Sequence, residues 1–211
     1  DLGVTEGHVP PEALFVETQA AVFAAIWDDY LSKGLMPIHL FQGDELHRPL
    51  AVGEKLTLSV KATPKLVNPM MFDVSCEFKD ASGAVVASTN TILYFSDTLA
   101  SSQAPAKLDV TTLAEIPITL AVTDDVIDEY MSVSGDDNPV HAGASQPGGI
   151  EPAQALGLRR RILHGMRVVN FAATAETTYL RGQGQPTSRD AGLWQTEFKG
   201  VVYPGDTLRA F

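Results

Sequence analysis

Apolar residues recur at three- and four-residue spacings over residues 10–34, which predicts a long helix. Pro10 and Pro11 stand where a helix can begin, and Gly34 stands where one can end. A helix that is apolar on more than one side is usually enclosed, so we expect a sheet to wrap around it. The apolar positions are Leu14, Phe15, Ala21, Val22, Ala25, Ile26 and Leu31.

The pattern then changes to the two-residue alternation of extended chain. Residues 38–63 form an extended region in which leucine and valine alternate with polar residues near its end. Residues 72–78 alternate cleanly, residues 80–83 supply turn chemistry, and residues 84–95 are rich in β-branched side chains, so a hairpin is predicted. One helix followed by antiparallel strands indicates an α+β arrangement.

A polar connector over residues 97–117 is the predicted boundary between two halves. A short strand is predicted over residues 116–122. Thr123 then has the properties of an N-cap, and the two aspartates that follow it suit the first turn of a helix running to about Val133.

A second helix is predicted over residues 165–180, after a long glycine- and proline-containing loop at residues 142–157, and residues 194–211 are strand-like. A weak internal repeat supports two similar halves, because the Gly-acidic corner at Gly53 resembles the one at Gly205. The first half continues through a hairpin, whereas the second ends six residues after Gly205. We therefore expect a fragment of a longer chain, or strands borrowed from a neighbour.

The most informative stretch is residues 130–141, which read Y-M-S-V-S-G-D-D-N-P-V-H. An Asn-Pro bend separates Asp136 from His141 and should bring the carboxylate and the imidazole together. Two such groups that reach one water form an acid/base couple, because imidazole titrates near neutrality. A surface turn with a bystander histidine is the alternative, and only a resemblance to a known family separates Asp136 from Asp137 as the acidic partner.

This stretch resembles the signature of the R-specific enoyl-CoA hydratases and MaoC-like dehydratases: an aromatic, a small residue, Gly-Asp-x-Asn-Pro, an aliphatic residue and His. Residues 162–166, I-L-H-G-M, resemble the start of the central helix in the same hot-dog fold. The resemblance implies that Asp136 and His141 are the catalytic pair and that Gly165 donates an oxyanion-binding backbone N–H.

The resemblance also implies a double hot-dog, each half an antiparallel sheet wrapped around a long central helix. Residues 1–97 would form a degenerate half without the motif, residues 98–117 a linker, and residues 118–211 the catalytic half, apparently incomplete at its C-terminus. The implied reaction interconverts trans-2-enoyl and (R)-3-hydroxyacyl thioesters by acid-base catalysis on a water. The sequence departs from the family pattern at Gly143, where an acidic residue is common.

The predicted substrate is a thioester of coenzyme A or of an acyl carrier protein. Three consecutive arginines precede the oxyanion glycine in an acidic chain and are candidates for holding phosphates, although for any single arginine a solvated loop is the favoured alternative. Asn138 is favoured to fix the bend, and an ordinary hydrogen-bonded histidine is the alternative for His164. The predicted substrate-binding residues are Asn138, His164, Met166, Arg159, Arg160 and Arg161.

Two other functions compete with this one. A hot-dog thioesterase would also use a carboxylate and a helix N-terminus, but hydrolysis does not need a second acid/base residue at this spacing. The other competing function is that of a non-catalytic acyl-binding or scaffold subunit of a fatty acid or polyketide synthase. No metal is predicted, because the ligand spacings are absent, and no cofactor is predicted beyond the coenzyme A or phosphopantetheine of the substrate.

Composition and charge exclude several other classes of protein. A net charge of −11 argues against nucleic-acid binding, and the single cysteine, Cys76, excludes an internal disulfide. No run reaches the roughly 18 apolar residues of a membrane span, and the first residues lack the order of a signal peptide. These features predict a cytoplasmic protein, and we expect a homodimer or a part of a larger assembly.

Overall fold

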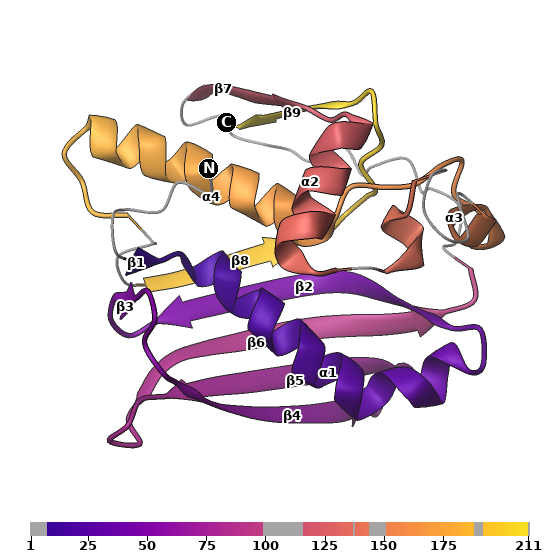
Figure 1. Cartoon of the computed structure of the whole chain (residues 1–211), viewed down its shortest axis with the longest axis horizontal. Coiled ribbons are helices and arrows are strands. Elements are labelled where there is room, and N and C mark those ends of the chain that lie inside the picture. The colour runs from indigo at the N-terminus through magenta and orange to yellow at the C-terminus, as the bar shows by residue number, and fades with distance from the viewer. Residues whose placement is uncertain (1–7, 99–115, 137, 144–150, 188–191, 211) are drawn as a thin grey trace. The chain divides into compact units, whose positions relative to one another are not determined.

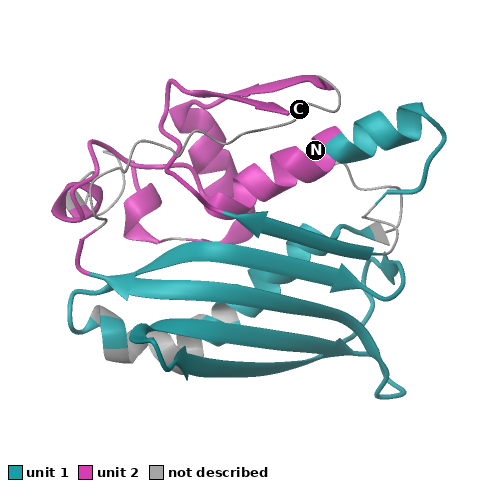
Figure 2. Ribbon diagram, turned by 180° about the vertical axis from the view of Figure 1, so that it is seen from behind, with its two compact units in different colours: residues 1–96, 176–197 teal, residues 97–175, 198–211 magenta. Residues whose placement is uncertain are grey.

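The computed structural model describes residues 8–98, 116–136, 138–143, 151–187 and 192–210 (Figure 1). The chain groups into two compact units, unit 1 with residues 1–96 and 176–197, and unit 2 with residues 97–175 and 198–211 (Figure 2). Residues 176–197 thus belong to unit 1, although the sequence analysis placed them in the half that begins at residue 118. Most of the predicted connector lies outside the described residues.

Unit 1 is built on an antiparallel five-stranded sheet with strand order β4-β5-β6-β2-β8. The predicted helix and the predicted hairpin, formed by β5 and β6, are both confirmed. The elements are β1 (His8–Val9), η1 (Pro11–Ala13), α1 (Leu14–Leu31), β2 (Met36–Leu46), β3 (Leu50–Ala51), β4 (Thr57–Lys65), β5 (Asn68–Lys79), β6 (Val85–Ser96) and β8 (Gly192–Glu197).

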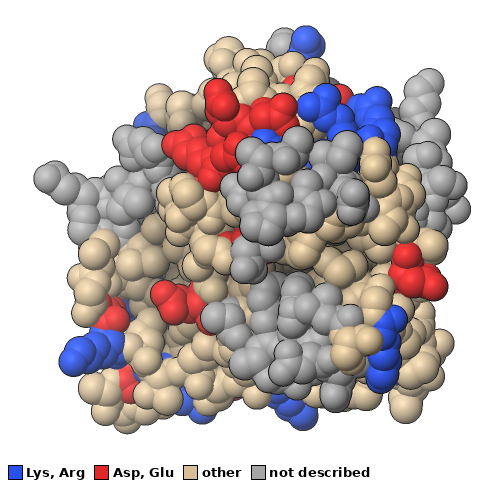
Figure 3. All heavy atoms as spheres, turned by 45° about the vertical axis from the view of Figure 1, so that its right-hand side comes forward, with Lys and Arg blue, Asp and Glu red and all other residues tan. Residues whose placement is uncertain are grey.

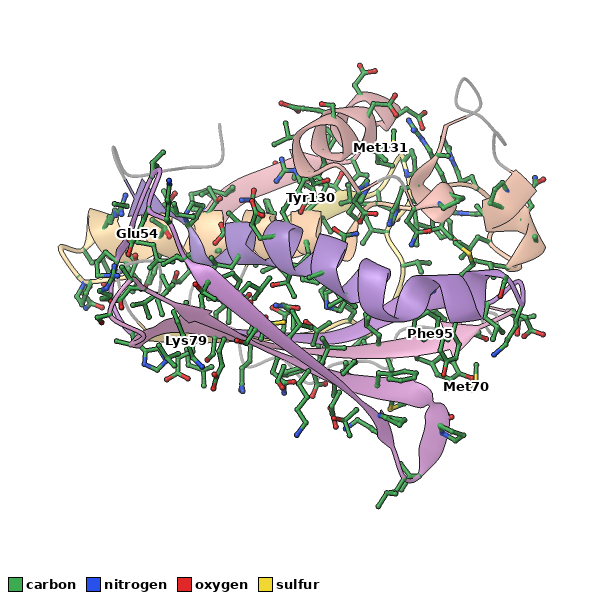
Figure 4. All side chains as sticks on the ribbon, turned by 60° about the horizontal axis from the view of Figure 1, so that its bottom comes forward. Glu54, Met70, Lys79, Phe95, Tyr130 and Met131 are labelled. Carbon is green, nitrogen blue, oxygen red and sulfur yellow. The ribbon has the colours of Figure 1, made fainter. Side chains whose placement is uncertain are left out.

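Helix α1 packs against one face of this sheet (Figure 1). Tyr30, near the end of the helix, lies 4.5 Å from Phe95 and 5.4 Å from Phe72 between ring centroids. Phe95, labelled in Figure 4, is 1% exposed. Burying an aromatic side chain of this size contributes about 1.5–3 kcal/mol, so the helix and the sheet stabilise one another as the apolar pattern predicts.

A polar network is buried in the same unit. The Gln42 amide nitrogen donates to Asp44 Oδ1 at 2.5 Å, and the Gln42 amide oxygen accepts from the Thr91 hydroxyl at 2.7 Å. Asp44 is 1% exposed, and its Oδ2 has no hydrogen-bond partner among the described residues. Burial raises the pKa of Asp44 to about 7, with a further rise from the charge of Glu12 and an opposing effect of the Gln42 bond.

Asp44→Asn is expected to stabilise the protein at alkaline pH. An unfolded Asp ionises near 3.8, whereas the folded carboxyl stays protonated to about pH 7. Its contribution to stability is therefore complete below pH 3.8 and is lost as pH rises through 7. At 1.36 kcal/mol per pKa unit the loss is at most about 4 kcal/mol, and Asn avoids it.

Urea unfolding of both proteins at low and at alkaline pH tests this expectation. Asp73→Asn is the matched control, because that carboxylate is 44% exposed and pairs with Lys65 at the surface. A stability difference for Asp44→Asn that does not grow as pH rises would contradict the assignment of a neutral buried carboxyl.

Unit 2 holds, among its described residues, a two-stranded antiparallel sheet of β7 (Ile116–Ala121) and β9 (Thr207–Ala210). Its helices are α2 (Asp124–Ser134), η2 (Pro139–His141), α3 (Glu151–Ala155) and α4 (Gly165–Gly182), the last of which belongs to unit 2 as far as Ala175. The predicted strand at residues 116–122 and both predicted helices are confirmed. Val122, Ile127 and Leu163 form a buried apolar cluster among its described residues. No helix in the described ranges has the length and apolar character that crossing a membrane requires.

Candidate active site

Helix α2 delivers the chain to the candidate site and ends sharply there. The Thr123 hydroxyl caps the start of the helix by accepting from the Val126 N–H at 3.3 Å. At the other end Gly135 has a φ of 69°, a left-handed conformation in which any side chain would be strained, and its N–H donates to the Met131 carbonyl at 3.0 Å. This reversal places Asp136 directly after the helix.

Two successive side-chain hydrogen bonds then hold the bend. Asp136 Oδ1 accepts from the Asn138 N–H at 3.1 Å, and Asn138 Oδ1 accepts from the Val140 N–H at 3.2 Å, which caps η2. Asn138 is buried. Its contacts are those of a residue that fixes the turn, the role favoured from the sequence. Asp137 lies outside the described residues.

His141 is buried at the end of η2 with a defined tautomer. Its Nδ1 lies 2.9 Å from the Ile162 carbonyl oxygen. Because a carbonyl only accepts hydrogen bonds, Nδ1 carries the proton of the neutral ring and Nε2 is left as a proton acceptor. Burial lowers the pKa of His141, and this outweighs the opposing effect of the Asp136 charge. The ring is therefore neutral near pH 7, in the state that a general base requires.

His164 stacks on this ring, with 3.7 Å between the two ring centroids and 26° between the planes. Tyr130, which comes from α2 (Figure 4), lies 4.9 Å from His164 between centroids. The His164 Nε2 lies 3.3 Å from the Asp136 carbonyl oxygen, and Nδ1 has no hydrogen-bond partner in the described parts of the chain. Burial, followed by the neighbouring His141, lowers the pKa of His164 to about 3, so this imidazole also stays neutral.

The three groups lie close enough to share one small molecule. One carboxylate oxygen of Asp136 and one ring nitrogen each of His141 and His164 all lie within 4.8 Å of one another. A water between Asp136 and His141 would be in reach of both. The same spacing would admit a metal ion, but imidazole lone pairs lie in the ring planes, and two stacked rings direct them side by side rather than at one point.

Gly165 is the first residue of α4, so its N–H has no acceptor four residues earlier within the helix. It directly follows His164, whose carbonyl accepts from the Arg167 N–H at 3.1 Å and acts as the helix start. A Cβ at Gly165 would lie 3.0 Å from Phe198 Cε1, so packing also favours glycine here. Met166, predicted as a substrate contact, is buried in the same first turn.

Arg159 and Arg160 are partly exposed, with 65% and 43% of their side-chain surface accessible. Arg159 lies 4.1 Å from the centroid of the Tyr203 ring, and Arg160 pairs with Asp124 at 3.3 Å. Figure 3 shows acidic and basic side chains gathered close together in the upper part of that view, as ion pairs of this kind require. Both side chains keep exposed surface that a phosphate could contact.

Arg161 differs from its two neighbours. Its side chain is only 4% exposed, and it pairs with Asp124 at 2.7 Å and with Asp128 at 2.6 Å. The predicted contact with substrate phosphates conflicts with this burial, because two carboxylates already compensate its charge. Sequence reasoning also missed the Ile162 carbonyl, which sets the tautomer of His141, since any residue type can supply a backbone acceptor.

Comparisons with known structures support the hot-dog fold. HtdX of Mycobacterium tuberculosis matches with a TM-score of 0.69 and 21% identity over 98% of this chain and 77% of that chain. A MaoC-like dehydratase matches with a TM-score of 0.67 and 18% identity over 95% of this chain and 71% of that chain. An acyl-ACP thioesterase from Bacteroides thetaiotaomicron matches with a TM-score of 0.62 and 12% identity over 98% of this chain and 79% of that chain.

No protein of curated function matches the sequence significantly. The described strands and helices have the α+β hot-dog architecture predicted from the sequence, and the motif residues 130–141 and 162–166 lie together in unit 2. The MaoC-like domain family matches residues 103–211, more than half of the chain, and the chain therefore belongs to this family.

Proposed function

We propose that this protein is a hydratase/dehydratase that interconverts trans-2-enoyl and (R)-3-hydroxyacyl thioesters. The observation that carries the proposal is the approach of the Asp136 carboxylate and a ring nitrogen of His141 to within 4.8 Å in a MaoC-like domain. Beside this pair begins helix α4, whose first N–H belongs to Gly165. These are the acid/base couple and the oxyanion donor that such a reaction needs.

In the hydration direction, the water oxygen bonds to C3 of the enoyl group while one water proton passes to His141 Nε2. The electron pair of the double bond moves toward the thioester, and the Gly165 N–H with the helix dipole stabilises the enolate oxygen. The proton then returns from His141 to C2. Asp136 orients the water and stabilises the transient imidazolium, in agreement with its effect of raising the pKa of His141.

The substrate would carry coenzyme A or a carrier-protein phosphopantetheine. We propose that Arg159 and Arg160 contact its phosphates, because both side chains keep exposed surface. Such contacts between exposed charges weaken with salt. The KM for an enoyl-CoA should therefore rise with ionic strength, and it should rise less steeply in Arg159→Gln and Arg160→Gln.

A thioesterase is the second candidate, favoured by the fold likeness to the acyl-ACP thioesterase. Incubation with crotonyl-CoA and a longer enoyl-CoA separates the candidates. Loss of the conjugated enoyl absorbance without thiol release supports the hydratase, and thiol release supports the thioesterase. Saturable binding with neither change would indicate a non-catalytic acyl-binding subunit and would reject the proposal.

The pH dependence of kcat/KM follows from the burial of His141. Its pKa is lowered from 6.5, so the neutral base persists at pH 6.5 and is lost only on further acidification. We expect kcat/KM to decline on the acid side with a midpoint below 6.5. A pH–rate profile with crotonyl-CoA measures this. A midpoint at or above 6.5 would show that His141 in the free enzyme is not held neutral by burial.

A further inference from the structure

Arg161 connects helix α2 to the turn that carries His141. Its Nε donates to Asp124 Oδ1 at 2.7 Å and its Nη2 to the Asp124 carbonyl at 2.8 Å. Its Nη1 donates to Asp128 Oδ1 at 2.6 Å and lies 3.4 Å from the His141 carbonyl oxygen. One buried guanidinium therefore bridges two turns of α2 and the backbone of the catalytic histidine.

The next residue continues this connection. The Ile162 N–H donates to the Val140 carbonyl at 3.2 Å, and the Ile162 carbonyl accepts from His141 Nδ1 at 2.9 Å. Three hydrogen bonds thus run between residues 161–162 and residues 140–141. Since Arg161 is held by α2, the acceptor that fixes the tautomer of His141 is held by α2 as well.

Gly143 provides the space for this guanidinium. A Cβ at this position would lie 2.7 Å from Arg161 Nη1 and 3.1 Å from Cζ, closer than side-chain atoms approach. The guanidinium is held by two carboxylates, so it can move away only by breaking these ion pairs, unlike a free side-chain end. The Arg161 side chain therefore requires a glycine at position 143, and the two residues act together as one packing contact.

We propose that Arg161, accommodated by Gly143, is a positioning residue that fixes the orientation and tautomer of His141 for the reaction. The expected effect on kcat rests on the proposed function, whereas the expected effect on the tautomer of His141 does not. Arg161 touches no reacting atom and acts through the His141 carbonyl and the adjacent Ile162 carbonyl. An arginine is needed because only its planar fork makes all these contacts at once, whereas a lysine supplies one point charge.

Arg161→Lys and Arg161→Gln separate geometry from charge. The charged groups around His141 are Asp136, Arg161 and, when protonated, His164, with Asp124 and Asp128 beyond the guanidinium. Both variants lose the fork, so we expect kcat to fall, by up to about 10²-fold, with little change in KM. Only the glutamine variant also removes the positive charge that lowers the pKa of His141. The acid limb of the pH–rate profile should therefore move to higher pH in Arg161→Gln but not in Arg161→Lys.

The tautomer can be observed without substrate. In the wild-type protein the imidazole ¹⁵N chemical shifts of His141 should show a protonated Nδ1 and an unprotonated Nε2, and in both variants a mixture of tautomers. This measurement separates the two proposals. Suppose that the wild-type protein has no hydratase activity, but its His141 has one fixed tautomer that becomes a mixture in Arg161→Lys. That result would reject the proposed function and support the positioning role. An unchanged tautomer in both folded variants would overturn the positioning role whatever the activity.

Gly143→Ala provides an independent route to the same contact, and it keeps the inference testable if Arg161→Gln fails to fold. The added methyl group should displace the guanidinium and lower kcat as Arg161→Lys does. Because both changes break one contact, the double variant should lose little more than either single variant. Arg48→Gln is the matched control, since Arg48 also pairs with two carboxylates but lies in unit 1, and it should leave kcat unchanged. Multiplicative losses in the double variant would overturn the proposal.

Discussion

Asp136→Asn is expected to lower kcat for crotonyl-CoA hydration by about 10²- to 10⁴-fold, because it removes the carboxylate that orients the water and stabilises the imidazolium of His141. Asn has nearly the same shape, and its Oδ1 can still accept from the Asn138 N–H, now 3.1 Å from the aspartate oxygen. The turn should therefore persist while the charge beside His141 is lost. Steady-state rates, with circular dichroism to confirm folding, measure the effect.

Asp125→Asn is the control for this variant, because Asp125 is an exposed carboxylate in the first turn of α2. A double variant with His141→Gln adds a second check. Residues that act as a unit are not additive, so the double variant should be little slower than the slower single variant. An Asp136→Asn variant that retains more than about a hundredth of the wild-type rate would contradict this role of the carboxylate.

Gly165→Pro should lower kcat by about 10²- to 10³-fold, the cost of removing one oxyanion donor. Proline lacks the N–H, yet its fixed φ suits the first turn of a helix, so α4 can still begin at this position. The loss should appear in kcat more than in KM, because the enolate oxygen gains charge only as the reaction proceeds.

Gly165→Ala separates the donor from the packing. Its Cβ would meet Phe198 Cε1 at 3.0 Å, as a proline Cβ also would, but it keeps the N–H. The rate difference between the Pro and Ala variants therefore reports the lost N–H together with the ring atoms of proline and its restriction of the His164 backbone. Equal rates for the two would mean that the Gly165 N–H is not the donor and that any loss arises from the displaced ring.

Local sequence patterns predicted the elements that local forces build. The apolar spacing predicted α1, the Thr123 cap predicted the start of α2, and the Asp-x-Asn-Pro-x-His run predicted the approach of Asp136 to His141. Each signal lies within a few residues of the structure it describes. Hydrogen bonds between neighbouring residues carry such signals directly.

Contacts between distant parts of the chain left no such signal. β8 pairs with β2 across about 150 residues of sequence, a register that no local pattern encodes. Arg161 was grouped with Arg159 and Arg160 because three adjacent arginines look alike in a sequence. Only the fold brings Asp124 and Asp128 against Arg161. The same contacts bury its side chain, so a phosphate cannot reach it.

The stacking of His164 on His141 has a consequence for where a proton can travel during turnover. A proton taken up by His141 would lie beside a second buried imidazole, and burial together with the neighbouring His141 lowers the pKa of His164 to about 3, which disfavours transfer of the proton to it. In the proposed reaction, the low pKa of His164 would therefore help to keep the water proton on His141, which returns it to C2 of the substrate.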